Sequence, residues 1–189
     1  MIAIVAIGLI LTMMGCGKYN GFVEKEGIVE QTWGEVQSAY QRRADLIPNL
    51  VNTVKGQADY EKETLESVVK ARASATSVNI DASNLNAENM AQFQKAQGQL
   101  SGALSRLLLT VERYPDLKAN QAFIELQSQL EGTENRIKVA RDKYTKAVTG
   151  YNIAIRKFPS NFFATIFGFD EKAQFEAQAG AENAPTVEF

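Results

Sequence analysis

The chain has 189 residues, enough for one domain with a sizeable core, and its formal charge of −2 gives no overall reason to expect nucleic acid binding. It contains no histidine, which excludes the commonest zinc ligand, the usual general base and the side chain that senses physiological pH. Its one cysteine, Cys16, excludes an intrachain disulfide and a cysteine cluster.

Residues 1–15 are apolar apart from Thr12 and carry no charged side chain. A membrane-spanning helix needs about 20 apolar residues, so the length fits the apolar region of a signal peptide better, although no lysine or arginine precedes it. The run LTMMGC at residues 11–16 is similar to a bacterial lipoprotein signal, in which the cysteine becomes lipidated. We expect residues 1–16 to attach the chain to a bacterial membrane, either as a single-pass N-terminal anchor or as a lipoprotein signal with Cys16 modified.

Four helical tracts are predicted after this segment. The first covers roughly residues 19–51, where apolar side chains recur at alternating steps of three and four residues, the spacing of a heptad seam. Its apolar members are Phe22, Val29, Trp33, Val36, Tyr40, Ile47, Leu50 and Val54. Glu26 and Arg43 are its polar members, so we expect Arg43 to point inward.

The second tract covers residues 60–75, and the polar residues 77–86 after it predict a loop. Asn86 can cap the third tract, which Pro115 ends, and Asn120 can cap the fourth, which Pro159 ends. The third seam comprises Met90, Phe93, Leu100, Leu104, Leu107, Val111 and Tyr114, interrupted by Gln97. The fourth comprises Phe123, Leu126, Leu130, Thr133, Ile137, Ala140, Tyr144, Ala147, Tyr151, Ala154 and Phe158.

These patterns predict an all-α fold, an antiparallel up-and-down, left-handed four-helix bundle with long helices after a short N-terminal membrane segment. One alternative is a single bent helix through both of the first two tracts. Otherwise the chain reverses, either at Pro48 or at Gly56. Residues 24–35 are acidic and residues 136–157 are basic, and they would face each other only in an even-numbered bundle, which favours four helices.

The expected organisation is an anchor or signal at residues 1–16, a helical bundle at 17–159, and a C-terminal part at 160–189. The C-terminal part begins with an aromatic segment and continues as an acidic tail that we expect to be disordered. Its candidate membrane-contact residues are Phe162, Phe163, Ile166, Phe167 and Phe169. This segment either folds back over the end of the bundle or contacts the lipid headgroups.

Charged residues gather around Pro48, a residue that costs a helix interior about 3 kcal/mol. Because Glu134 and Glu112 lie one position from their seams, we expect a structural charge network that fixes the register of the helices. The residues of this network are Arg42, Arg43, Asp45, Glu112 and Glu134. The alternative is a charge cluster that binds a partner.

Several stretches of the chain resemble the LemA family. They are QRRADLIPNLV at 41–51, VKG at 54–56, ERYPDLKAN at 112–120, ENRI at 134–137 with Ala140, Arg141 and Tyr144, GYN at 150–152, and Phe158-Pro159. Tyr19-Asn20, just after the apolar segment, also fits. The resemblance covers roughly residues 19–170. It implies a short membrane segment, a four-helix bundle and no known enzymatic activity, whereas Cys16 departs from the family's plain single-pass anchor.

No residue set in the sequence predicts catalysis. Di-metal sites in helical bundles use Glu-x-x-His pairs, which a chain without histidine lacks. We therefore expect a non-enzymatic scaffold or adaptor at the bacterial cell envelope, attached through its N-terminus, with an unknown protein partner and no cofactor, nucleic acid or small-molecule substrate. The alternatives are a lipid-interacting module that uses the Phe-rich segment and a metal-dependent enzyme built on carboxylates.

Overall fold

The computed structural model describes residues 1–56 and 62–176, without the side chains of residues 4–12. Within this part all regular structure is helical, as predicted. The elements in chain order are α1 (Ile2–Lys55), α2 (Lys62–Ser77), the 3₁₀ turn η1 (Ala82–Asn84), α3 (Ala87–Val111), α4 (Pro115–Lys118), α5 (Gln121–Arg156) and α6 (Ser160–Phe167).

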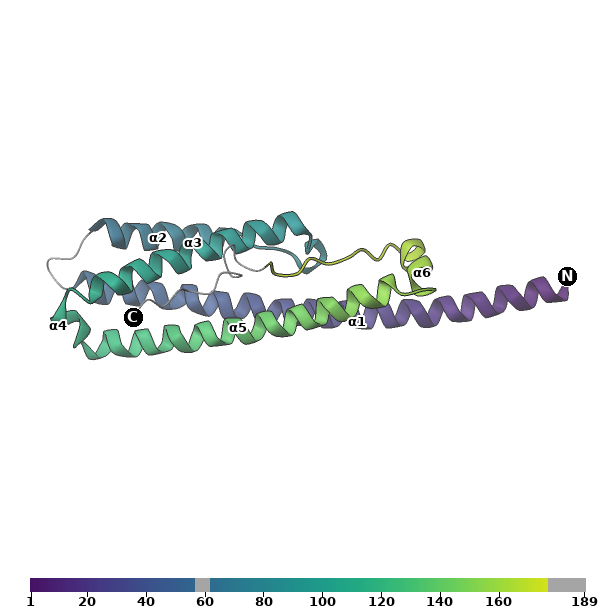
Figure 1. The fold of residues 1–189 in the computed structure, drawn as a ribbon, viewed down its shortest axis with the longest axis horizontal. Coiled ribbons are helices and arrows are strands. Elements are labelled where there is room, and N and C mark those ends of the chain that lie inside the picture. The colour runs from purple at the N-terminus through teal and green to yellow at the C-terminus, as the bar shows by residue number, and fades with distance from the viewer. Residues whose placement is uncertain (57–61, 177–189) are drawn as a thin grey trace, which may run out of the picture.

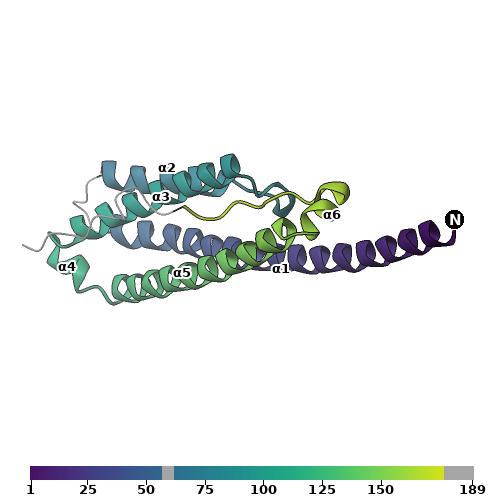
Figure 2. The ribbon, with the colours of Figure 1, turned by 45° about the vertical axis from the view of Figure 1, so that its right-hand side comes forward.

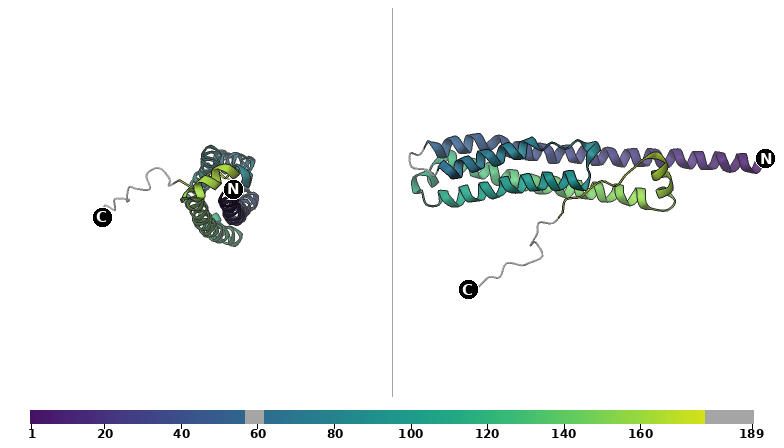
Figure 3. Two further views of the ribbon diagram at one scale, coloured as in Figure 1. Left: turned by 90° about the vertical axis from the view of Figure 1, so that its right-hand side faces the viewer. Right: turned by 90° about the horizontal axis from the view of Figure 1, so that it is seen from above.

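Four long helices, α1, α2, α3 and α5, lie side by side and alternate in direction (Figure 1). The view from above shows the same elongated rod, with α1 extending well beyond its neighbours at the N-terminal end, and the view down the long axis shows the helices packed around one another (Figure 3). The chain does not reverse at Pro48, which lies inside α1; the helix ends at Lys55 with Gly56 as its C-cap. The first two tracts are therefore separate helices, and the connection at residues 57–61 lies outside the described residues.

The predicted caps are present at both places. The Asn86 side chain accepts a hydrogen bond from the Asn89 amide at 2.9 Å, and the Asn120 side chain accepts one from the Phe123 amide at 3.2 Å. Each satisfies an amide that the first turn of a helix leaves unpaired. The two caps position α3 and α5, which carry most of the residues discussed below.

The buried core consists of two apolar clusters stacked along the rod. One cluster is centred on Trp33 and Tyr144 and the other on Leu50 and Leu107. All eight apolar members of the predicted α1 seam are buried, which confirms that tract. A heptad seam read from sequence thus predicts most of the core, because one helical stripe must face its neighbours along the whole rod.

The α5 seam departs from prediction in its last third. Val148 and Ile155 are buried instead of Ala147 and Ala154, which are half-buried. Phe158, predicted to point inward, is 89% exposed because α5 ends at Arg156. A straight helix of 3.6 residues per turn drifts by about 20° per heptad from a strict 3.5-residue repeat, so the buried stripe moves over one position.

The hydrogen bond that Pro48 removes from α1 is replaced by a bond to α2. Proline lacks an amide hydrogen, so the carbonyl of Ala44, four residues earlier, loses its helical donor. Arg72 of α2 donates from Nε to this carbonyl at 2.8 Å. Because Ala44 is buried, the arginine satisfies an acceptor that water does not reach, and it ties α2 to α1 at the proline.

The segment 169–176, which we call the C-terminal strap, packs against the bundle, a feature that the sequence reasoning missed. It runs back from α6 along the bundle toward α3 (Figure 2). Its backbone carbonyls at Asp170 and Ala173 accept hydrogen bonds from the buried hydroxyls of Tyr151 and Tyr144, at 2.9 and 2.8 Å. Phe175 packs edge-on to the Tyr144 ring at 5.4 Å between centroids, and the guanidinium of Arg141 lies over the Phe175 ring at 4.4 Å from its centroid.

The Phe-rich segment forms α6, which folds back onto α1. Gly168 ends α6 in the left-handed conformation with φ of 75°, a region that favours glycine. Phe163 and Phe167 lie over Gly15, where an added Cβ would come within 3.3 Å of the Phe163 ring, so a small residue allows this close approach. Phe169 packs edge-on to Phe22 at 5.2 Å between ring centroids.

Among the described residues, no helix is long and apolar enough to cross a membrane. The anchor predicted at residues 1–16 falls largely on residues 4–12, whose side chains are outside the description. The tail predicted to be disordered, from residue 178 onward, also lies outside the described residues.

The role of Arg72 as the substitute donor for the Ala44 carbonyl can be tested with a double-mutant cycle on Pro48 and Arg72. Arg72→Ala leaves the buried Ala44 carbonyl without a donor, so we expect it to lower the free energy of unfolding by about 1–3 kcal/mol. In a Pro48→Ala background the residue at position 48 regains an amide that can reach this carbonyl. The Arg72→Ala cost, measured by urea unfolding, should then fall below about 1 kcal/mol. Equal costs in both backgrounds would contradict the replacement.

The buried tyrosines predict a loss of stability at alkaline pH. Burial raises the pKa of Tyr40, Tyr144 and Tyr151 above the usual 10.0. Each phenol therefore ionises more readily in the unfolded chain, so its contribution to stability is complete below about pH 10 and is lost as the pH rises toward the folded-state pKa. Urea unfolding from about pH 8 to about pH 11 should show this decline, and Tyr144→Phe should make it less steep. If the decline of unfolding free energy with pH is equally steep in Tyr144→Phe, the buried Tyr144 hydroxyl does not cause it.

Candidate functional site

A layer of polar side chains separates the two apolar clusters of the core, and Arg43 is its centre. The Arg43 residue is only 2% exposed, on the seam of α1 between Tyr40 and Ile47. Its Nη1 donates to Ser101 Oγ at 2.8 Å and to Glu134 Oε2 at 3.1 Å. Its Nη2 donates to the side-chain oxygen of Gln97 at 2.8 Å and to the Gln97 backbone carbonyl at 3.3 Å.

This layer joins all four long helices. Arg43 is on α1, Gln97 and Ser101 are on α3, and Glu134 is on α5. Gln97 extends the layer to α2, because its Nε2 donates to the carbonyl of Ala75 at 3.2 Å. That carbonyl lies in the last turn of α2, where helical donors run out. We call Arg43, Gln97, Ser101 and Glu134 the central polar layer.

Burial and charge act together on the tyrosine beside the layer. The Arg43 guanidinium lies 5.0 Å from the centroid of the Tyr40 ring, within cation–π range. Burial raises the pKa of Tyr40, although the nearby Arg141 and Arg43 oppose the rise. Tyr40 is therefore neutral at physiological pH and acts as a packing partner of the guanidinium.

The structure brings together two of the five residues predicted to form a charge network, Arg43 and Glu134. Glu112 lies at the far end of α3 and pairs with Lys118 instead. Asp45 is exposed and accepts a hydrogen bond from Gln41 at 2.7 Å, and Arg42 is also exposed. Arg42 and Asp45 lie next to the buried stripe of α1 in sequence, but the turn of the helix directs their side chains away from the core.

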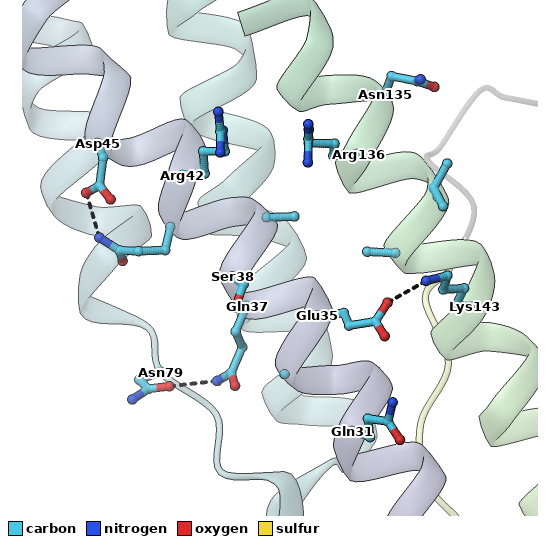
Figure 4. Close-up of a pocket in the computed structure, with 15 residues that line it drawn as sticks. Gln31, Glu35, Gln37, Ser38, Arg42, Asp45, Asn79, Asn135, Arg136 and Lys143 are labelled. Atoms are coloured by element: carbon cyan, nitrogen blue, oxygen red, sulfur yellow. Dashed lines mark hydrogen bonds and ion pairs between the residues drawn. The ribbon is translucent and has the colours of Figure 1, made fainter. Parts of the chain in front are cut away.

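Those outer residues line a groove between α1 and α5 (Figure 4). The groove has a volume of about 1280 Å³, and Gly34, Ser38, Ala39 and Ala140 are among the residues that line it. At its α6-facing end Lys143 of α5 forms an ion pair with Glu35 of α1 at 2.8 Å. This pair joins the basic part of the last helix to the acidic part of the first, as the charge pattern predicted.

The other predicted site residues occupy the α6 end of the rod. Cys16 is exposed on α1, one residue after the glycine that α6 covers. Phe163 and Phe169 are half-buried against α1, and Phe167, 40% exposed, packs edge-on to Tyr19, whereas Phe162 and Ile166 are exposed. The segment therefore divides into one face that packs on the bundle and one that faces outward.

The sequence missed two of the partners of Arg43. Gln97 was visible as a polar interruption of the α3 seam, and a buried glutamine at heptad spacing opposite a seam arginine could have paired them. Ser101 gave no signal, because serine at a helix surface is common and its role depends on how α3 is turned.

Chemically, the central polar layer is suited to packing. The Arg43 Nη atoms donate within the layer, and its Nε is buried without an acceptor in the described part of the chain. Within residues 1–56 and 62–176, no group of three or more His, Cys, Asp or Glu side chains could hold a metal ion. Fold and site together define an elongated helical-bundle protein with a layer of polar side chains that form hydrogen bonds across its four long helices.

The chain belongs to the LemA family, whose model matches residues 32–189. This agrees with the resemblance carried by the motifs of α1 and α5. It is 26% identical to magnetosome protein MamQ 2 of Paramagnetospirillum magneticum over 187 residues, covering 90% of this chain and 68% of that protein. Magnetosome protein MamQ of Magnetospirillum gryphiswaldense has the same identity and coverage. Protein LemA of Metamycoplasma hominis is 23% identical over 161 residues, covering 85% of this chain and 70% of that protein.

Unequal burial in the Arg43–Glu134 pair predicts unequal costs of substitution. Arg43→Met leaves the buried acceptors on Gln97 unpaired, so we expect a loss of about 1–3 kcal/mol in the free energy of unfolding. The Glu134 side chain is 63% exposed and water can solvate what remains, so Glu134→Gln should cost less than about 1 kcal/mol. Urea unfolding of both variants measures the difference, and a Glu134→Gln cost equal to that of Arg43→Met would contradict this account.

Proposed function

We propose that the chain is a non-enzymatic scaffold or adaptor that is attached to a membrane of the bacterial cell envelope by its N-terminus and presents a stiff helical rod to a protein partner. The observation that carries the proposal is the continuity of α1. It runs for 54 residues from the apolar N-terminal segment through the whole bundle. At 1.5 Å per residue this is about 80 Å of helix, so whatever holds its start also orients the bundle.

The N-terminal part of α1 supports attachment. It extends beyond the other helices, and residues 1–17 contain no charged side chain (Figure 1). An apolar helix without helical neighbours of its own chain exposes hydrocarbon to water unless a membrane or a partner covers it. A membrane could hold it by partial or complete insertion, or through a lipid on Cys16.

The arrangement of polar groups supports a scaffold role. The buried guanidinium of Arg43 donates hydrogen bonds to α3 and α5, and Gln97 extends these bonds to α2. The strap, the hydrogen bond from Arg72 to the Ala44 carbonyl and the central polar layer all stiffen the rod. What remains available to other molecules is the long outer surface of the helices.

Attachment can be tested in a bacterial host by fractionation of the full chain. We expect the unmodified chain in the membrane fraction after a carbonate wash. Ile4→Lys with Ile10→Lys should move most of it to the soluble fraction, because a charge in the bilayer costs about 2.5–3.5 kcal/mol at a helix centre.

The matched control is Val23→Lys with Ile28→Lys, which adds the same two charges to exposed positions of α1 inside the bundle. This control should stay in the membrane fraction. The proposed attachment would be contradicted if the unmodified chain were found in the soluble fraction, or if the two double variants were found in the membrane fraction to the same extent. Mass spectrometry of the washed protein then separates a lipid-modified Cys16 from an unmodified helix.

A second candidate function, contact of α6 with lipid headgroups, is favoured by its exposed apolar face. Phe162 and Ile166 of α6 are 64% and 60% exposed, Phe158 just before α6 is 89% exposed, and α6 lies against α1 where that helix leaves the bundle. Phe162→Ser with Ile166→Ser should reduce the fraction that remains on the membrane. If this variant is retained as fully as the unmodified chain, α6 only covers the end of the bundle.

A further inference from the structure

The groove between α1 and α5 contains two arginines that face each other, and neither forms an ion pair within the described part of the chain. In Figure 4 the guanidinium of Arg42 on α1 points toward that of Arg136 on α5. Both line the groove, and among the described residues neither has a hydrogen-bond or ion-pair partner. Like charges repel, so two arginines that face each other across the groove give the fold no electrostatic stabilisation.

The register of the two helices shows what is missing. Glu35 and Lys143 pair across the groove at 2.8 Å. Because α1 and α5 are antiparallel, a step of seven residues forward on α1 and seven back on α5 reaches the next pair on the same faces, Arg42 and Arg136. The first pair, Glu35 and Lys143, consists of an acid and a base, whereas the next pair, Arg42 and Arg136, consists of two bases. A carboxylate between these two arginines would complete the pattern of opposite charges.

The groove is large enough for a polypeptide segment. Its volume of about 1280 Å³ exceeds the roughly 300–1,000 Å³ of small-molecule pockets. It is open along the rod, and its lining includes Gly34 and Ser38, with open space above the glycine. A partner backbone can therefore approach closely between the two helices.

Two of the family motifs each contain buried residues and residues that line the groove. In QRRADLIPNLV, the side chains of Arg43, Ala44 and Ile47 are buried, whereas Gln41, Arg42 and Asp45 line the groove. In ENRI, Ile137 is buried while Asn135 and Arg136 line the same groove. The buried halves build the bundle, and the exposed halves of two distant stretches converge on one surface that the bundle does not use.

We infer that this groove is the docking surface for an acidic segment of a protein partner, with a partner carboxylate bridged by Arg42 and Arg136. A guanidinium group binds a carboxylate through two parallel hydrogen bonds. A carboxylate placed between the two arginines would also offset the repulsion between their positive charges. The inference rests on the proposed scaffold function and specifies where its partner binds and with what chemistry.

Photocrosslinking in the bacterial host tests the docking directly. The full chain carries a benzoylphenylalanine at Ser38, beside Arg42 on the wall of the groove. We expect a protein adduct whose crosslinked peptide, mapped by mass spectrometry, contains Asp or Glu. Arg42→Gln with Arg136→Gln should reduce its yield by about tenfold or more, a loss typical of removing charge-assisted bonds.

The control, Arg106→Gln with Lys138→Gln, removes the same charge from exposed positions outside this groove and should leave the yield unchanged. No adduct at Ser38, an adduct through a peptide without acids, or equal loss in the control would overturn the inference. A second crosslinker at Leu109, 72% exposed on α3, separates the two proposals. A partner captured at Leu109 but not at Ser38 keeps the scaffold and rejects the groove, whereas no partner at either position rejects both.

A measurement on the purified chain checks the unpaired charges independently of any partner. At low ionic strength Arg42→Gln relieves the repulsion, so we expect the Tm to rise by about 1–2 °C, and the rise should shrink in high salt. A lower Tm would show that Arg42 already has a stabilising counter-charge, which would overturn the inference.

Discussion

The four long helices depend on one buried guanidinium. Arg43 divides the core into two apolar clusters, and its hydrogen bonds reach α3 and α5 directly and α2 through Gln97. Apolar heptad seams alone permit neighbouring helices to slide by a turn, because one apolar layer resembles the next. A buried polar layer has a single arrangement that satisfies its donors, so a slip of one turn would leave Arg43 unpaired in the core. We therefore propose that the layer sets the register of the helices, at the cost of some apolar burial.

Two further features depend on that register. The Ala44 carbonyl, freed by Pro48, lies one residue from Arg43 and meets Arg72 of α2 only when α1 and α2 are correctly aligned. The strap holds the other half of the rod, where Tyr144 and Tyr151 donate to its backbone and Lys172 pairs with Glu26 at 2.8 Å. Polar contacts thus hold the rod at its centre, at its proline and along the cluster next to α6.

Periodicity in the sequence predicts the apolar part of this structure well. The seam of α1 and the inward position of Arg43 follow from spacing, since a helix turns by a nearly constant angle per residue. The caps at Asn86 and Asn120 follow from residue type, because asparagine is favoured just before the first turn of a helix. Spacing fails where that angle accumulates, so the α5 stripe shifts to Val148 and Ile155. It also fails for the strap, whose Phe175 and backbone carbonyls have no period. Arg42 and Asp45 were grouped with Arg43 by proximity in sequence, yet their side chains point away from the core. Glu112 was grouped with Arg43 because it lies one position from the α3 seam, yet it stands at the far end of α3 and pairs with Lys118.

The central claim is that Arg43 couples all four long helices through one polar layer. Amide hydrogen exchange of the full chain, unmodified and with Arg43→Met, measures this most directly. The account predicts faster exchange in the variant around residue 43 of α1, the last turns of α2, residues 97–101 of α3 and residue 134 of α5 together. Faster exchange confined to the turn of α1 that holds residue 43 would contradict it.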